Sequence, residues 1–234
     1  MALLLDILRT EQKYLLTIEE ADKLSFLLSA VMKPDKHNSK GGYLVRSLYF
    51  DTQFDNDFYE KLDGFECRRK IRLRVYSPEA ETAKLELKEK QGKMQRKRSL
   101  TLSREDAESM CQGDYSILMK QDTPFAEELY GRMRQFAYQP KCLIEYKREA
   151  FTAPVNDTRV TLDREIRSNI NCRDIFSTCP ALYPVEPLNN VTMEVKFNHF
   201  LLSYVKDLVS LPSHMQISAS KYGMCRNQIL RKDP

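Results

Sequence analysis

The chain has 234 residues, of which 42% are hydrophobic and 7 are Gly, a composition that argues against a membrane protein or a flexible low-complexity chain. This length allows one large domain or two small ones, either with a substantial hydrophobic core. The net charge of +4 results from 37 Lys and Arg against 33 Asp and Glu, so the placement of the charges is more informative than their sum.

The first half of the chain predicts several strands and one helix. Apolar residues such as Leu24 and Leu28 recur at helical spacing, and this segment stops before Pro34. Gly92 separates two alternating segments and predicts a hairpin. The predicted strands span residues 7–17, 43–51, 66–77, 83–90 and 97–103, and the predicted helix spans 19–32.

The second half begins with helices and returns to strands. Ser103 is a residue type that caps helices, and it predicts a helix that ends at Cys111. A second helix is predicted at 123–138, strands at 141–151, 158–167 and 191–198, and helical segments around Val205 and after Tyr222. Roughly eight strands, mostly adjacent in the chain, are typical of an antiparallel α+β protein, for which a closed barrel is one arrangement.

The sequence also predicts a location for the protein. No segment is long enough to cross a bilayer, and the first residues lack the features of a signal peptide. The six Cys are scattered without a CxxC pair, which indicates structural thiols in a reducing compartment rather than a zinc site. We therefore expect a cytoplasmic protein with no membrane span; the sequence does not indicate its oligomeric state.

Charged side chains share one face of several predicted strands. Alternate residues of a strand point to opposite faces, and in residues 66–77 the basic side chains alternate with Ile71, Leu73 and Val75. One such strand is most simply an amphipathic strand with its charged face in water. Six strands with the same mixed face favour a shared anion-binding surface or interior. The face comprises Arg9, Glu11, Lys13, Arg68, Lys70, Arg72, Arg74, Lys84, Glu86, Lys88, Lys97, Arg159, Glu194 and Lys196.

The charge balance of this face indicates its ligand. Glu11, Glu86 and Glu194 offset only part of the positive charge, and phosphates would offset the rest. The same carboxylates are suitable ligands for Mg²⁺ or Mn²⁺, which accompany phosphate chains. A phosphate nucleophile is ionised at neutral pH, so phosphoryl transfer here requires no His or Ser base.

The motifs occur in an order that resembles a known family. They are Arg9-x-Glu11-x-Lys13-Tyr14, Lys70-Ile71-Arg72-Leu73-Arg74, Glu86-Leu87-Lys88, Glu145-Tyr146-Lys147-Arg148, Arg159-Val160-Thr161-Leu162-Asp163, Met193-Glu194-Val195-Lys196-Phe197 and Ser220-Lys221-Tyr222. This series resembles the VTC domain, the polyphosphate polymerase branch of the triphosphate tunnel metalloenzymes (the CYTH-like superfamily).

The resemblance implies an α+β fold in which an eight-stranded antiparallel β-barrel forms a tunnel with helices packed outside. It implies one VTC-type domain over residues 1–234 that transfers the γ-phosphate of ATP to a growing polyphosphate, with Mn²⁺ or Mg²⁺ as cofactor. The predicted catalytic residues are Lys13, Arg72, Arg74, Lys88, Arg148, Arg159 and Lys221. The predicted substrate-binding residues are Arg9, Lys70, Lys97, Lys196, Tyr146 and Ser220, and the predicted metal ligands are Glu194, Glu11 and Glu86. Lys97 is chosen over its neighbours Arg96 and Arg98 because it shares a face with Ser99 and Thr101. Tyr146 shares a face with Arg148 and could line the tunnel, but it is equally compatible with packing in the core.

Two alternatives stay open beside the polymerase. The hydrolase and cyclase relatives usually begin with Glu-x-Glu-x-Lys, whereas Arg9 stands here in place of the first Glu, which favours the polymerase over a tripolyphosphate or nucleoside triphosphate hydrolase. The other alternative is a non-catalytic binder of polyphosphate or nucleic acid. Nucleic acid is not expected as a partner, because aromatic residues are not interleaved among the basic ones to stack on bases.

Overall fold

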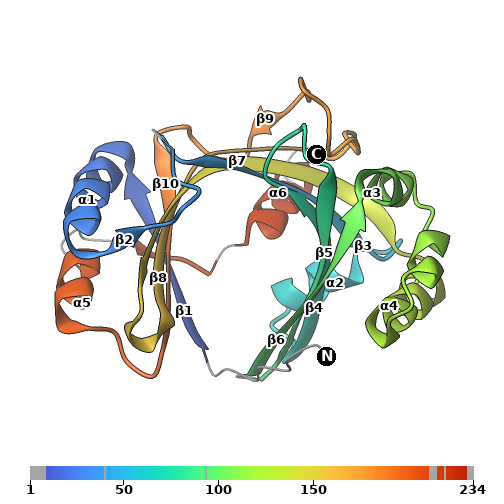
Figure 1. The fold of residues 1–234 in the computed structure, drawn as a ribbon, viewed down its shortest axis with the longest axis horizontal. Coiled ribbons are helices and arrows are strands. Elements are labelled where there is room, and N and C mark those ends of the chain that lie inside the picture. The colour runs from blue at the N-terminus through green and yellow to red at the C-terminus, as the bar shows by residue number, and fades with distance from the viewer. Residues whose placement is uncertain (1–8, 40, 93, 211–214, 219, 231–234) are drawn as a thin grey trace.

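One antiparallel sheet that bends into a deep U forms the centre of the molecule (Figure 1). The computed structural model describes residues 9–39, 41–92, 94–210, 215–218 and 220–230. The long strands are β1 (Arg9–Thr17), β3 (Tyr43–Asp51), β4 (Cys67–Val75), β5 (Thr82–Gln91), β6 (Met94–Ser103), β7 (Gln139–Ala153), β8 (Thr158–Asn169) and β10 (Asn190–Asn198). They follow one another across the sheet in the order β1-β10-β8-β7-β3-β4-β5-β6, and each neighbouring pair is antiparallel. The α+β class and the predicted strands are therefore confirmed; residues 7 and 8 of the first predicted strand lie outside the described residues.

The prediction of a closed eight-stranded barrel is wrong. In the described residues the sheet has 11 strands. Three two-residue strands join the eight long ones: β2 (Lys33–Pro34), β9 (Tyr183–Pro184) and β11 (Met215–Gln216). The sheet is open: in the described residues β1 does not pair with β6, and at Tyr14 and Leu15 its outer edge pairs with β11 instead. The Ile217 amide also donates to the Lys13 carbonyl (2.9 Å), so this segment lies where β6 would have to pair to close a barrel.

Most helices cover the outer face of the sheet, as predicted. The helices α1 (Ile18–Val31) and α5 (Ser203–Ser210) bury Leu24 and Val205 against β1, β8 and β10. On the other arm of the U, α3 (Arg104–Cys111), η1 (Ser116–Lys120) and α4 (Pro124–Gln135) bury Met110 and Leu129 against β4 and β5. Apolar residues of the outer face thus meet the apolar faces of the helices, which is the main stabilising contact of the fold.

The helix ends follow from local sequence. Thr17 and Glu20 form a capping box at the start of α1, and Ser103 caps α3 by accepting from the Asp106 amide (3.1 Å), as predicted. Thr123 caps α4, whose first residue is Pro124. None of the helices in the described part of the chain is long and apolar enough to span a bilayer.

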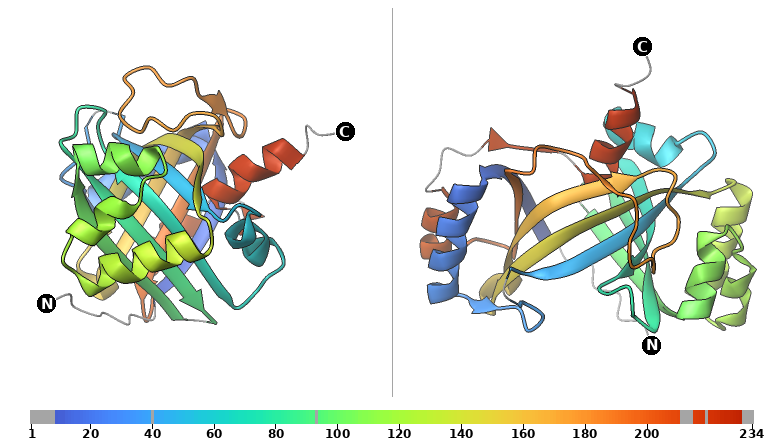
Figure 2. Two further views of the ribbon diagram at one scale, coloured as in Figure 1. Left: turned by 90° about the vertical axis from the view of Figure 1, so that its right-hand side faces the viewer. Right: turned by 90° about the horizontal axis from the view of Figure 1, so that it is seen from above.

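Two helices do not lie outside the sheet. α2 (Asn56–Leu62) and α6 (Lys221–Leu230) contact each other on one side of the U, where Figure 2 shows them close together. Tyr222 of α6 packs with Tyr49 and Tyr146 from the concave face; its ring stacks on Tyr49 at 5.3 Å between centroids. Its hydroxyl donates to the buried Asp51 (2.6 Å), which also accepts from the backbone amides of residues 52, 57 and 58. This polar contact joins α6 to the end of β3.

We predict that Tyr222→Phe lowers the free energy of unfolding by about 1–3 kcal/mol, because a buried carboxylate loses a hydrogen-bond donor while the ring remains. Urea unfolding of the variant and wild type measures the difference. Tyr183→Phe, at an exposed position, is the control and should unfold like wild type. Equal stability of all three proteins would contradict this role of Tyr222.

Candidate functional site

The concave face of the sheet, here called the inner face, carries the predicted charged residues in cross-strand rows. In one row Arg72 of β4 lies opposite Glu86 of β5, which lies opposite Ser99 of β6. The next row contains Lys70, Lys88 and Lys97. The predicted side of Lys97 is confirmed: its ammonium contacts Glu86, whereas Arg98 turns to the outer face and binds Glu128 of α4.

Glu86 orients the arginines of this arm of the U. Its buried carboxylate accepts from Arg72 Nε at 2.6 Å and lies 3.9 Å from Arg74. Burial opposes ionisation of Glu86, but Arg72, Arg74 and Lys97 lower its pKa to about 2. Arg72 also donates to the Tyr49 hydroxyl (3.0 Å). The two guanidinium groups are therefore held in defined positions before any ligand binds.

Two partly buried cations and one buried carboxylate lie together on the middle of the inner face. Arg148 of β7 donates to both oxygens of Asp163 on β8 (2.6 and 2.8 Å), and the Lys221 ammonium contacts the same carboxylate. Both cations lie over the Tyr146 ring, Arg148 at 5.2 Å and Lys221 at 4.6 Å from its centroid. Tyr146 is thus both buried and part of the inner face, with its hydroxyl 3.4 Å from Arg74.

Asp163 is a site residue to which the sequence analysis assigned no role. Burial opposes its ionisation, but Arg148 and Lys221 lower its pKa to about 2. Tyr49 was not singled out either. Both could have been found from strand alternation, because Asp163 has the parity of Arg159 and Tyr49 lies opposite Arg72.

The other arm of the U contributes carboxylates and lysines from β1 and β10. Across this pair Glu11 lies opposite Lys196, and Lys13 lies opposite Glu194. Burial and the neighbouring Glu194 oppose ionisation of Glu11, but Lys13, Lys88 and Lys196 lower its pKa to about 2. Burial likewise opposes ionisation of Glu194, and Lys196 and Lys13 hold its pKa well below the usual value.

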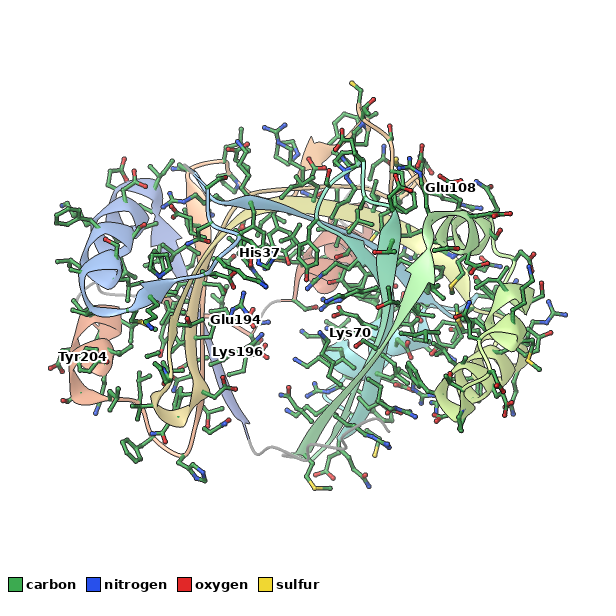
Figure 3. All side chains as sticks on the ribbon, in the orientation of Figure 1. His37, Lys70, Glu108, Glu194, Lys196 and Tyr204 are labelled. Atoms are coloured by element: carbon green, nitrogen blue, oxygen red, sulfur yellow. The ribbon has the colours of Figure 1, made fainter. Side chains whose placement is uncertain are left out.

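Side chains from the two arms contact each other across the space between them. Lys88 of β5 donates to Glu11 of β1 at 3.0 Å, although these strands are not neighbours in the sheet. A cavity of about 390 Å³, here called the inner cavity, lies at this junction and is bordered by Glu11, Lys13, Lys70, Lys88 and Ser220 among others. Figure 3 shows Lys70 on one arm and Glu194 and Lys196 on the other, all pointing into the space between them.

Lys70 has the least compensated charge of this group. Among the described residues, no carboxylate lies within ion-pair distance of its ammonium. Burial lowers the pKa of Lys70 well below its usual value, and Lys13, Lys61 and Lys88 lower it further. An anion placed beside Lys70 would reverse this effect, so this position favours a negatively charged ligand.

The remaining predicted residues lie at the periphery. Arg159 is part of the inner face but binds Asp35 (2.9 Å) and the Tyr43 hydroxyl (3.1 Å). Ser220 borders the inner cavity and accepts from the Gly223 amide (3.1 Å) at the start of α6. Arg9 pairs with Asn198 through its backbone, and its side chain lies outside the described residues.

The predicted metal ligands separate into two places. Glu11 and Glu194 lie together, since Lys196 contacts Glu194 and approaches Glu11 at 3.9 Å, whereas Glu86 lies on the opposite arm among cations. In the described chain no three acidic, His or Cys side chains gather as a metal-binding group. Mg²⁺ commonly binds one or two carboxylates and takes its other ligands from water and phosphate. Glu11 and Glu194 fit that requirement, and Glu86 does not share their location.

We predict that Glu86 stabilises the fold in a pH-dependent way. Its pKa is about 2 in the folded protein and near 4.5 when unperturbed, so the contribution of about 3 kcal/mol is present above about pH 4.5 and is lost as the pH falls towards 2. The stability difference between wild type and Glu86→Gln, measured by denaturant unfolding, should therefore be larger at neutral pH than at about pH 3. Glu127→Gln, at an exposed position of α4, is the control; a difference that does not vary with pH would contradict the assignment.

Comparison with known proteins agrees with this geometry. The sequence matches the VTC domain family over residues 8–230. Among solved structures, a candidate adenylate cyclase from Bacillus halodurans superposes with a TM-score of 0.52 at 16% identity, covering 98% of each chain. HpAC1 from Hippeastrum, a candidate adenylyl cyclase with a dominant triphosphatase activity, gives a TM-score of 0.53 at 15% identity, covering 96% of each chain. No curated protein sequence matches the chain. At these identities the structural likeness establishes the fold, and the match over residues 8–230 establishes the family: the chain belongs to the VTC domain family and has the fold of the triphosphate tunnel proteins.

Proposed function

We propose that the chain is a single-domain, metal-dependent polyphosphate polymerase that transfers the γ-phosphate of ATP to the end of a polyphosphate held between the arms of the U. The observation that supports this most strongly is the cation-rich inner face, on which Lys70 has no carboxylate partner among the described residues. Cations that face each other across a partly enclosed space repel one another, and a linear polyanion would neutralise them.

The arginines support a defined pose for the phosphates. Arg72 is oriented by Glu86 and Tyr49, Arg74 donates to Ser47 (3.1 Å), and Arg148 is fixed by Asp163. Donors that are held in place before the reaction need little reorganisation as charge develops on the transferred phosphoryl group. We assign contact with phosphate to Lys13, Arg72, Arg74, Lys88, Arg148, Arg159 and Lys221, and further substrate contacts to Arg9, Lys70, Lys97, Lys196, Tyr146 and Ser220. Asp163 and Glu86 are positioning residues in this scheme.

The carboxylates Glu194 and Glu11 would hold Mn²⁺ or Mg²⁺. When bound, a divalent cation supplies charge neutralisation at the phosphate oxygens. Both carboxylates are ionised at neutral pH, because Lys13 and Lys196 keep their pKa values low. Glu86 binds Arg72 and Lys97 instead, so we assign it to orienting these cations.

The reaction needs no protein base. An ionised oxygen of the terminal polyphosphate unit forms a bond to the γ-phosphorus of ATP, and the bond from that phosphorus to the β–γ bridging oxygen breaks. The electron pair leaves with ADP, and the chain grows by one phosphate. ATP and polyphosphate repel each other, and this repulsion is a large part of the barrier to the reaction. The lysines and arginines lower it by neutralising the charges and holding the two polyanions in line.

Hydrolysis of a triphosphate is the second candidate. It is favoured by the dominant triphosphatase activity of the structurally similar Hippeastrum protein, and it would need water in place of the polyphosphate oxygen. The same inner face would serve a non-catalytic polyphosphate binder equally well. These functions differ in products and can be separated in one assay.

We predict that incubation with ATP and Mn²⁺ yields ADP and long polyphosphate chains, seen on a stained gel, with little free phosphate. Free phosphate without chains would support the hydrolase, and tight binding without turnover would support the binder. Glu194→Gln should abolish turnover without loss of the folded state in circular dichroism. Full activity of that variant would exclude Glu194 as a metal ligand.

The two carboxylate sites should also differ in metal affinity. We predict that Glu194→Gln weakens Mn²⁺ binding in the presence of tripolyphosphate by about tenfold or more, because it removes a charged ligand. Glu86→Gln, an identical change on the other arm, should leave Mn²⁺ affinity close to wild type. Electron paramagnetic resonance of free Mn²⁺ measures both, and equal losses in the two variants would contradict the division of roles.

A further inference from the structure

A second basic cavity, here called the outer cavity, lies at the end of β4, β5 and β6. Its volume is about 370 Å³, and most of its lining comes from the outer face of these strands, with Arg132 added from α4. Outer-face residues that border it include Arg69, Glu89 and Arg96, which form one cross-strand row. It lies mainly on the outer face, whereas the transfer reaction is proposed on the inner face.

The outer cavity and the inner cavity meet at one row of side chains. Arg68, Lys90 and Gln95 lie opposite one another on β4, β5 and β6, and together with Arg69 they border both cavities. This is the last inner-face row before the turn between β5 and β6. Because β6 is an edge of the sheet, a flexible ligand can pass from the inner row around this end to the outer row.

The outer cavity carries an excess of positive charge. Among the described residues its cations are Arg68, Arg69, Lys90, Arg96 and Arg132, and Glu89 is the carboxylate that borders it. Arg69 also lies 3.6 Å from Asp57 and 3.7 Å from Glu60, outside the cavity lining. Glu89 is already engaged, since it accepts from Arg98 at 3.0 Å and lies 3.7 Å from Arg132. Within the described ranges no carboxylate pairs with Arg68, Lys90 or Arg96.

Arg96 is the clearest sign of a missing ligand. It is half-buried, and its Nε is inaccessible and has no hydrogen-bond partner in the part of the chain that the structure describes. The Nε of the neighbouring Arg98 also has no partner there, but the other nitrogens of Arg98 donate to Glu89 and Glu128, whereas among the described residues no carboxylate contacts Arg96. A buried guanidinium nitrogen without an acceptor is costly, and phosphate oxygens are well suited to supply one.

We propose that the outer cavity binds the part of a polyphosphate chain that has left the space between the arms, so that product runs from the inner cavity over Arg68 and Lys90 to Arg96 and Arg132. This inference rests on the proposed function, because it takes the ligand of the inner face to be polyphosphate. A linear chain with a negative charge on every unit cannot remain within the inner cavity as it grows. The end that accepts phosphate stays between the arms, and the adjoining row of cations offers the opposite end of the chain an electrostatically favourable path outward.

The test compares short and long polyphosphate on the full-length protein. Tripolyphosphate can occupy the inner face alone, whereas a long-chain polyphosphate can reach both cavities. Arg96→Gln should weaken binding of the long chain by about tenfold and reduce the slope of log affinity against log salt by about one, with tripolyphosphate binding unchanged. Glu89→Gln should have the opposite effect and tighten long-chain binding. Arg134→Gln is the control. It removes an exposed cation from the helix that carries Arg132, but Arg134 does not line the cavity, so this variant should bind both ligands like wild type.

The outcomes separate this inference from the function on which it rests. Wild type that binds tripolyphosphate normally, with no selective loss for the long chain in Arg96→Gln, would overturn the outer path alone. Equal losses in Arg96→Gln and Arg134→Gln would overturn it too, because the effect would then be general charge. Wild type that binds neither phosphate would overturn the proposed function itself. A single-stranded RNA of equal charge that binds as tightly as polyphosphate, with the same dependence on Arg96, would overturn the assignment of the ligand.

Discussion

Repulsion between cations that face one another is the constraint on which the rest of this fold depends. The strands of the two arms present lysines and arginines to a common space, and a protein that enclosed them unpaired would be unstable. Carboxylates are therefore distributed so that each cluster keeps an internal counter-charge: Glu86 on one arm, Glu11 and Glu194 on the other, and Asp163 between them. The ion pair between Lys88 and Glu11 also links β5 and β1, which are not neighbours in the sheet of the described residues.

These ion pairs limit how the site can bind phosphate. A cation that already holds a buried carboxylate gains less from an incoming anion than one without a partner, because the anion must compete with the existing pair. Arg148 is bound to a fully buried Asp163 and acts as a fixed donor, whereas Lys70 has no carboxylate partner among the described residues and gains most from an incoming phosphate. The carboxylates thus stabilise the folded protein in the absence of phosphate. Phosphate then gains most of its binding energy from cations that have no carboxylate partner, such as Lys70.

Sequence alternation and the ordered motifs were enough to predict the long strands, the cap at Ser103 and the side of the sheet on which Lys97 lies. They could not predict that the sheet stays open, because closure depends on what pairs with the edge of β1, and the two residues of β11 carry no periodic signal. Asp163 had the right parity, but its importance comes from convergence with Lys221, 58 positions away in the chain. The placement of α6 against the inner face depends on Tyr222 reaching Asp51, a tertiary contact that helical spacing does not encode.

A polymerase and a hydrolase on this fold have different electrostatic requirements. A hydrolase brings one polyanion to a neutral water molecule, so a set of cations that matches a single triphosphate suffices. A polymerase must hold two polyanions with their charged ends in contact. It must also accommodate a product chain whose growing end stays at the site while the rest of the chain leaves it, so it needs positive charge beyond that set. Arg68, Lys90 and Arg96 could serve this second purpose in the proposed polymerase, because they lie beyond the predicted phosphate contacts and form no ion pair within the described residues. Hydrolysis of a single triphosphate would not require the excess of charge at the end of β4, β5 and β6, whereas the proposed chain growth would use it.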